Sequence, residues 1–150
     1  MSIGQRLDDD LKSAMKGGEK EKVSILRFLL SNIKNRRIEK GKNAVLSDDE
    51  IIQVVMNSIK QRRDAIEQFR QGGRQDLVEK EERELGVLQS FLPQQLTDEE
   101  LVEKIRCVIV ETGAMGVKDI GKVMKAVMPR VAGRAEGSVV SAKVKLLLTA

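Results

Sequence analysis

The chain has 150 residues and a formal net charge of +4, and it contains no histidine and a single cysteine. This composition excludes Ser-His-Asp and Cys-His nucleophiles, histidine-ligated metals, an internal disulfide and a thiolate metal site. Hydrophobic residues make up 41% but aromatic residues only 2%, so the core must consist of Leu, Ile, Val and Met, which favours packed helices over a β-sandwich.

The first 93 residues are predicted to form a bundle of about four helices. Apolar residues recur there at the three- and four-residue spacing of an amphipathic helix, and glycines separate the segments. Ser47 and Glu50 form a capping box that starts the third helix, and Pro93 ends the fourth. The expected helices cover residues 3–16, about 20–40, 48 to about 70, and the segment from Leu77 to Leu92.

The sequence PQQLTDEE, which begins at Pro93, predicts a domain boundary, and Thr97 with Glu100 is a second candidate capping box. Pro129 predicts a kink or an early end in the helix that contains it. Cys107 lies among apolar residues and is expected to be a buried helix cysteine. We therefore predict an all-α protein with a helical domain over 1–93 and a small three-helix domain over 94–150, with helices over 98–112, about 118–131 and about 137–148.

Two charged residues interrupt the apolar stripes of the third and fourth helices. Arg62 falls in the stripe of one helix and Glu81 in the stripe of the next, so antiparallel packing would bring them together. We predict a partly buried ion pair that fixes the register of the two helices. The alternative interpretation is an anion site formed by Arg62 and Arg63.

The end of the chain is its electropositive part. Residues 113–150 hold seven Lys or Arg against two Asp or Glu, whereas residues 94–112 hold two against five. The glycines of the stretch from Gly121 to Val140 do not have the spacing of a Walker A motif, and no strand precedes them. A basic edge beside a glycine turn remains, which could hold a phosphate backbone. The candidate residues are Lys118, Lys122, Lys125, Arg130, Gly133 and Arg134, with the turn exposing the last two.

A second cluster of cations lies in KNRRIEKGK, from Lys34 to Lys42. Cations at the end of a helix complement its macrodipole, and a solvated helix face explains most such clusters. A nucleic-acid patch is the alternative, although the segment lacks aromatic residues on which bases could stack.

The whole chain resembles the YqeY family, on the segments KQRRDAIEQF, GRQDLVEKEERELGVLQSFLPQQLTDEEL and GKVMKAVMPRVAGRAEGSVV. Its last segment is also similar to the tail domain of GatB, a subunit of the tRNA-dependent amidotransferase. The resemblance implies two all-α domains and a tail that holds tRNA. It also implies association with a tRNA synthetase or an amidotransferase. The catalytic domain of GatB has no counterpart in these residues.

The favoured hypothesis is a non-catalytic, tRNA-binding accessory protein with no cofactor and no membrane or DNA partner. Neutralising about four phosphates would give a slope near −3 to −4 in log affinity against log salt. One alternative is a glutamine-dependent carbon–nitrogen ligase, as the GatB resemblance suggests, with candidate groups in Ser138, Ser141, Lys125 and Cys107. Another is a helical protein-interaction module that docks through the methionine-bearing helix over Lys118–Met128, although methionines at the spacing of Met124 and Met128 are more often core residues. The N-terminal residues show no signal-peptide pattern, which predicts a cytoplasmic protein.

Overall fold

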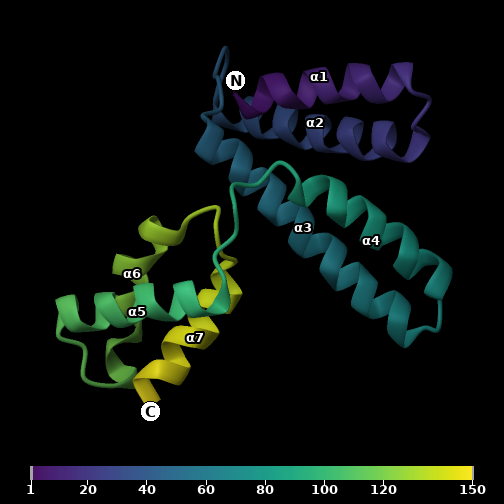
Figure 1. Cartoon of the computed structure of the whole chain (residues 1–150). Coiled ribbons are helices and arrows are strands. Elements are labelled where there is room, and N and C mark those ends of the chain that lie inside the picture. Colours follow the sequence, from purple (N-terminus) through teal and green to yellow (C-terminus); the bar gives the residue numbers. More distant parts are fainter. Residues whose placement is uncertain (1, 150) are drawn as a thin grey trace. The chain divides into compact units, whose positions relative to one another are not determined.

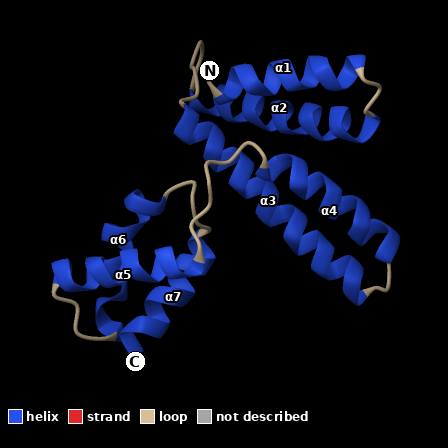
Figure 2. Cartoon of the chain, in the orientation of Figure 1, coloured by secondary structure: helices blue, strands red, loops and turns tan. Residues whose placement is uncertain are grey.

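A computed structural model describes residues 2–149, and within that range seven α-helices and one 3₁₀ helix make up the secondary structure, without a strand. Figure 2 shows this all-helical content, which confirms the predicted fold class. The chain divides into two compact units, Met1–Leu92 and Pro93–Ala150. None of the helices within 2–149 has the length and apolar character that crossing a bilayer requires.

The first unit contains two helical hairpins, one formed by α1 with α2 and the other by α3 with α4 (Figure 1). Leu7, Leu26, Val55 and Leu88, one from each helix, are fully buried and belong to one apolar cluster. The hairpins therefore share a core, which consists mainly of aliphatic side chains, as the low aromatic content predicts. The helices span Ile3–Lys16 (α1), Lys20–Lys40 (α2), Asp48–Gln71 (α3) and Gln75–Gln89 (α4).

Side-chain caps fix where the helices of this unit begin. The Ser47 hydroxyl accepts a bond from the Glu50 amide and the Glu50 carboxylate accepts one from the Ser47 amide, which confirms the capping box. The fourth helix ends at Gln89, before the expected end at Pro93, because the chain turns there to bury Phe91. Arg6 holds this turn by donating to the Ser90 carbonyl at 3.0 Å.

The second unit is a three-helix domain with its own aliphatic core. Ile105, Val123 and Val140, each from a different helix, are fully buried and belong to one cluster. Pro129 does not shorten its helix: it leaves the Lys125 carbonyl without its usual amide donor, and the helix continues to Val131. The elements are α5 (Asp98–Thr112), the 3₁₀ helix η1 (Val117–Asp119), α6 (Ile120–Val131) and α7 (Gly137–Thr149).

Two local expectations in the second unit need correction. Only half of the second capping box forms, because the Thr97 hydroxyl accepts from the Glu100 amide but itself donates to the Glu100 carboxylate. The expectation of a buried Cys107 is wrong, because its side chain is exposed. Helix α5 buries Leu101, Ile105 and Val108, and a residue two positions after Ile105 points to the opposite side of the helix.

Candidate nucleic-acid interface

Three lysines of the predicted basic edge lie along the exposed side of α6. Lys118 belongs to η1, directly before α6, and Lys122 and Lys125 follow it at intervals of four and three residues. Lys122 and Lys125 are therefore neighbours on the surface of α6, whereas Val123 belongs to the buried core of the unit. We call these residues, Lys118, Lys122 and Lys125, the lysine face.

The lysine face carries positive charge that the fold does not neutralise. Of the residues that the structure describes, none places a carboxylate within ion-pair distance of these three ammonium groups. Ammonium groups in such positions keep their hydration and stay available to anions from outside the protein. Successive side chains on this side of the helix therefore present a row of cations, which suits a backbone of regularly spaced phosphates.

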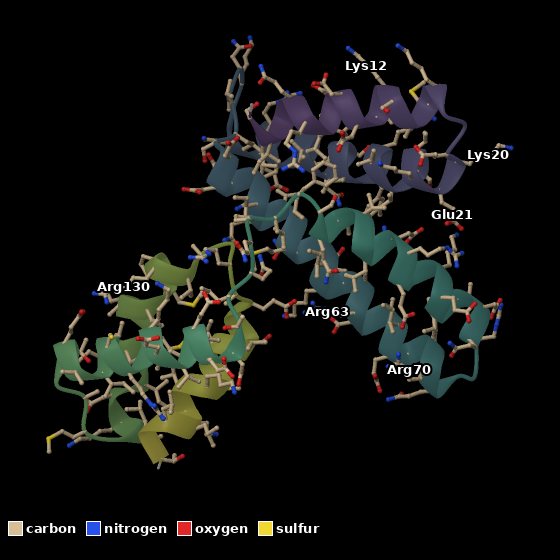
Figure 3. The ribbon with its side chains drawn as sticks, viewed as in Figure 1. Lys12, Lys20, Glu21, Arg63, Arg70 and Arg130 are labelled. Carbon is tan, nitrogen blue, oxygen red and sulfur yellow. The ribbon has the colours of Figure 1, made fainter. Side chains whose placement is uncertain are left out.

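Arg130 does not belong to this row, although it was predicted as part of the same edge. Its guanidinium forms an ion pair and a hydrogen bond with the Glu111 carboxylate of α5, and Figure 3 labels it at the end of α6. The hydrogen bond from Arg130 lowers the pKa of Glu111, so the carboxylate stays ionised and the pair stays neutral overall. The charge of Arg130 is thus used to join α5 to α6.

The glycine turn after α6 is not exposed as predicted, because the start of the unit covers it. Gly133 is buried and has a φ of 77°, a left-handed conformation that favours glycine. Its carbonyl accepts a 2.8 Å bond from the Gln95 side chain. Arg134 is half-buried, and its Nε donates to the Gln94 carbonyl at 3.0 Å. The two residues hold the first segment of the unit in place, and this is their visible role.

The second cation cluster, between Lys34 and Lys42, is partly neutralised. Lys40 lies 2.6 Å from a Glu50 oxygen, and its hydrogen bond lowers the pKa of that carboxylate. Arg36 lies 3.6 Å from Glu39 one turn along α2. Two cations of the cluster are therefore paired, one with Glu39 inside the cluster and one with Glu50 of α3, which makes it less suited than the lysine face to bind a polyanion.

The predicted pair between Arg62 and Glu81 forms, and Glu84 adds a second carboxylate that the sequence analysis did not include. Arg62 Nη1 lies 3.0 Å from Glu81 Oε2 and 2.9 Å from Glu84 Oε2. The side chain of Arg62 is 19% exposed, that of Glu81 14% and that of Glu84 10%. The Arg62 guanidinium also lies over the Phe28 ring, 5.0 Å from its centroid. We call Arg62, Glu81 and Glu84 the ionic cluster; it joins α3 to α4.

The ionic cluster contains one cation for two carboxylates, and Glu84 is the less well stabilised of the two. Burial raises the pKa of Glu84, and the neighbouring Glu81 raises it further, while Arg62 acts in the opposite direction. Glu84 Oε2 is near Arg62 but accepts no hydrogen bond from the described residues. Because both carboxylates already surround Arg62, the alternative anion site at Arg62 and the exposed Arg63 finds no support here.

The groups considered for catalysis are distributed over three helices and are exposed. Cys107 is on α5, Lys125 on α6, and Ser138 and Ser141 on α7. Among the described residues, no carboxylate forms a hydrogen bond with any of these side chains. The structure therefore does not assemble them into a nucleophile with a neighbouring base.

Three contacts that decide the site were not found from the sequence. Glu84 follows Glu81 by three residues, so helical spacing could have identified it as a neighbour on the same face. Glu111 and Gln94 meet their arginines, Arg130 and Arg134, from segments far away in sequence. No spacing rule identifies such pairs before the packing of the helices is known.

Comparison with known proteins identifies one matching family and several similar proteins. The family described as Yqey-like protein matches residues 4–148. A protein of Pyrenophora tritici-repentis named Altered inheritance of mitochondria protein 41, mitochondrial, is 33% identical over 135 residues, which cover 89% of this chain and 73% of that protein. An uncharacterized protein of Schizosaccharomyces pombe is 39% identical over 84 residues, covering 56% of this chain and 67% of that protein.

The Altered inheritance of mitochondria protein 41, mitochondrial, of Saccharomyces cerevisiae is 35% identical over 96 residues. These residues cover 63% of this chain and 51% of that protein. The expectation of a cytoplasmic location is wrong in the light of these names, because the Pyrenophora and Saccharomyces relatives are named mitochondrial proteins. The expectation relied on the lack of a signal-peptide pattern, which bears on secretion only. The similarity of the last segment to the GatB tail stays a prediction.

Proposed function

The chain belongs to the YqeY family, and on this premise we propose that it is a non-catalytic accessory protein that binds tRNA through the lysine face. The observation that carries the proposal is the row of Lys118, Lys122 and Lys125, which are exposed and have no carboxylate partner among the described residues. The names of the relatives give no biochemical activity, and the chemistry of this surface is what supports tRNA binding.

The lysine face would recognise the phosphate backbone and not the bases. Ammonium groups contact phosphates as point charges, and such contacts position a nucleic acid without reading its sequence. Selectivity would then come from the fold of the RNA, and the similarity of the tail to GatB favours tRNA over DNA. This proposal favours a protein partner that acts on the same tRNA, either a tRNA synthetase or an amidotransferase.

The structure changes the number of phosphate contacts that we expect. Arg130 and Arg134 already bind Glu111 and the Gln94 carbonyl, so three cations of the original set remain free. Each phosphate neutralised contributes a slope of about −0.7 to −0.9 in log affinity against log salt. We therefore expect a slope of about −2 to −3, smaller than the value expected for four contacts.

Fluorescence anisotropy of the full chain with labelled bulk tRNA at increasing salt tests the proposal. The Lys122→Gln, Lys125→Gln double variant should reduce the magnitude of the slope by about 1.4 to 1.8, because two phosphate contacts are lost. The matched control is the Lys34→Gln, Lys42→Gln variant, which removes the same charge from the other unit. Absence of binding by the unmodified protein at low micromolar concentration in low salt would contradict the proposal, as would an equal loss in both variants.

A further inference from the structure

A hollow of about 300 Å³ lies between α2 and α3 in the first unit, and its walls are rich in carboxamides. Ligand sites occupy about 300 to 1,000 Å³, so the hollow has the size of a site for a small ligand. Its floor consists of Val54 and Ser58, which are 8% and 2% exposed. We call it the amide groove; the carboxamides that line it are Asn32, Asn35, Gln53, Asn57 and Gln61.

The amides form two rows because of helical spacing. Asn32 and Asn35 are three residues apart on α2, while Gln53, Asn57 and Gln61 follow one another at four-residue intervals on α3. Residues at these intervals share one face of a helix. The two rows line a single groove, with donors and acceptors on both sides of it.

Most of this hydrogen-bonding capacity is not used within the protein. Asn32 donates a long bond of 3.4 Å to the Ser58 hydroxyl. Among the described residues, no partner donates to or accepts from the side chains of Asn35, Gln53, Asn57 or Gln61. Each of these planar amides can therefore offer both a donor and an acceptor to a ligand.

The charge of the groove limits the kind of ligand. Its two ionic residues, Arg36 and Glu39, lie 3.6 Å apart and form a pair, so the walls are close to neutral. A neutral wall of amides does not favour a metal ion, which prefers carboxylate oxygens, and it offers no excess positive charge to a phosphate group. It suits an uncharged planar group whose edge alternates donors and acceptors.

We propose that the amide groove binds an unpaired nucleobase by its hydrogen-bonding edge. Asn and Gln side chains pair with base edges through one donor and one acceptor each, as in their contacts with adenine. Val54 on the floor offers an apolar surface to the base. The base can come from a free nucleotide or from an unpaired position of an RNA. The proposal is separate from the lysine face, since the groove lies in the other unit.

The side-chain amide signals of the groove report binding directly in ¹⁵N–¹H correlation spectra of the full chain. Titration with the four nucleoside monophosphates should shift the signals of Asn57 and Gln61, while those of Gln68 and Gln89, which lie outside the groove, stay unchanged. Ribose 5-phosphate serves as the ligand without a base and should shift neither set. Groove signals that do not move with any nucleotide, or that move equally with ribose 5-phosphate, would overturn the proposal.

Substitution separates specific binding from a general effect. The Asn57→Ala and Gln61→Ala variants change exposed side chains, so the fold should persist, and each should weaken nucleotide binding about fivefold or more. Gln68→Ala, on the same helix but outside the groove, is the matched control and should bind as the unmodified protein does. Equal affinity in all variants would contradict the proposal.

A short single-stranded oligoribonucleotide distinguishes the two sources of the base. Tighter binding than the mononucleotide, lost in Gln61→Ala, supports an unpaired RNA position, and equal affinity supports a free nucleotide. Both results agree with a base-binding groove. Because mononucleotides do not need the row of lysines, failure at the groove leaves the tRNA proposal intact, and failure of tRNA binding leaves the groove intact.

Discussion

The ionic cluster and the lysine face use charge in opposite ways. In the first, Arg62 lies between two carboxylates with most of its surface buried. In the second, Lys118, Lys122 and Lys125 are exposed, and none of the described carboxylates reaches them. A buried charge must be neutralised within the fold, because leaving it alone costs several kcal/mol, whereas an exposed ammonium is stabilised by water.

The same difference between neutralised and exposed charge separates the other cations of the basic stretch. Arg130 and Arg134 come from the same basic stretch as the lysine face, yet their guanidinium groups bind Glu111 and the Gln94 carbonyl. In this stretch the two planar, multidentate arginines join segments of the fold, and the three lysines of the lysine face are exposed to solvent. A charge count alone does not separate the two groups, and their partners in the structure do.

Removing the central cation should have the largest effect. We expect Arg62→Met to lower the free energy of unfolding at neutral pH by about 3 to 5 kcal/mol, because two buried carboxylates then lack a counter-charge. Urea denaturation measures this loss. Arg70→Met is the matched control: this arginine of α3 also pairs with glutamates, but it is 56% exposed, and its loss should cost less than about 1 kcal/mol. Similar losses in the two variants would contradict a special role for Arg62.

Removing the arginine of the glycine turn should have an intermediate effect. We expect Arg134→Gln to lower the free energy of unfolding by about 1 kcal/mol, because the bond to the Gln94 carbonyl is lost. The slope of tRNA affinity against salt should stay the same, since the half-buried Arg134 side chain is held against the Gln94 carbonyl and does not belong to the lysine face. A reduced slope with unchanged stability would return Arg134 to the phosphate-binding set.

Neutralising the destabilised carboxylate should have the smallest effect, and it depends on pH. Burial raises the pKa of Glu84 in the folded chain, so the folded state holds this proton more tightly than the unfolded state. The stability that this proton contributes is therefore lost as the pH rises from the pKa of Glu84 in the unfolded chain to its raised pKa in the folded chain. We expect Glu84→Gln to raise the free energy of unfolding by about 0.5 to 1 kcal/mol at neutral pH. Below the ordinary carboxyl pKa the substitution should leave this free energy unchanged. Denaturation curves over this pH range would contradict the account if the variant were less stable throughout.

The fold could be predicted closely because local signals fix most helix boundaries. The Ser47 capping box and the apolar spacing of the segment over 20–40 predicted helices that the structure confirms. The end of α4 was placed too late, because the burial of Phe91 depends on packing across the unit. The Arg62–Glu81 contact was predictable since each residue interrupts an apolar stripe, a pattern that carries through to the packed helices.

The candidate interface was only half predictable. Helical spacing predicts that Lys122 and Lys125 are neighbours, because both lie on α6, and Lys118 lies in the 3₁₀ helix directly before it. Arg130 and Arg134 were assigned to the same edge because they are near in sequence, but their partners come from α5 and from the segment before it. Which cations remain free depends on long-range contacts, and these appear only in the folded structure.

Lysine footprinting tests the central claim most directly. The full chain is acetylated with and without saturating tRNA, and mass spectrometry measures the modification rate at each lysine. Our account predicts that tRNA protects Lys118, Lys122 and Lys125, while Lys34 and Lys42 react at the same rate in both samples. Protection of Lys34 and Lys42 with no change along the lysine face would contradict it.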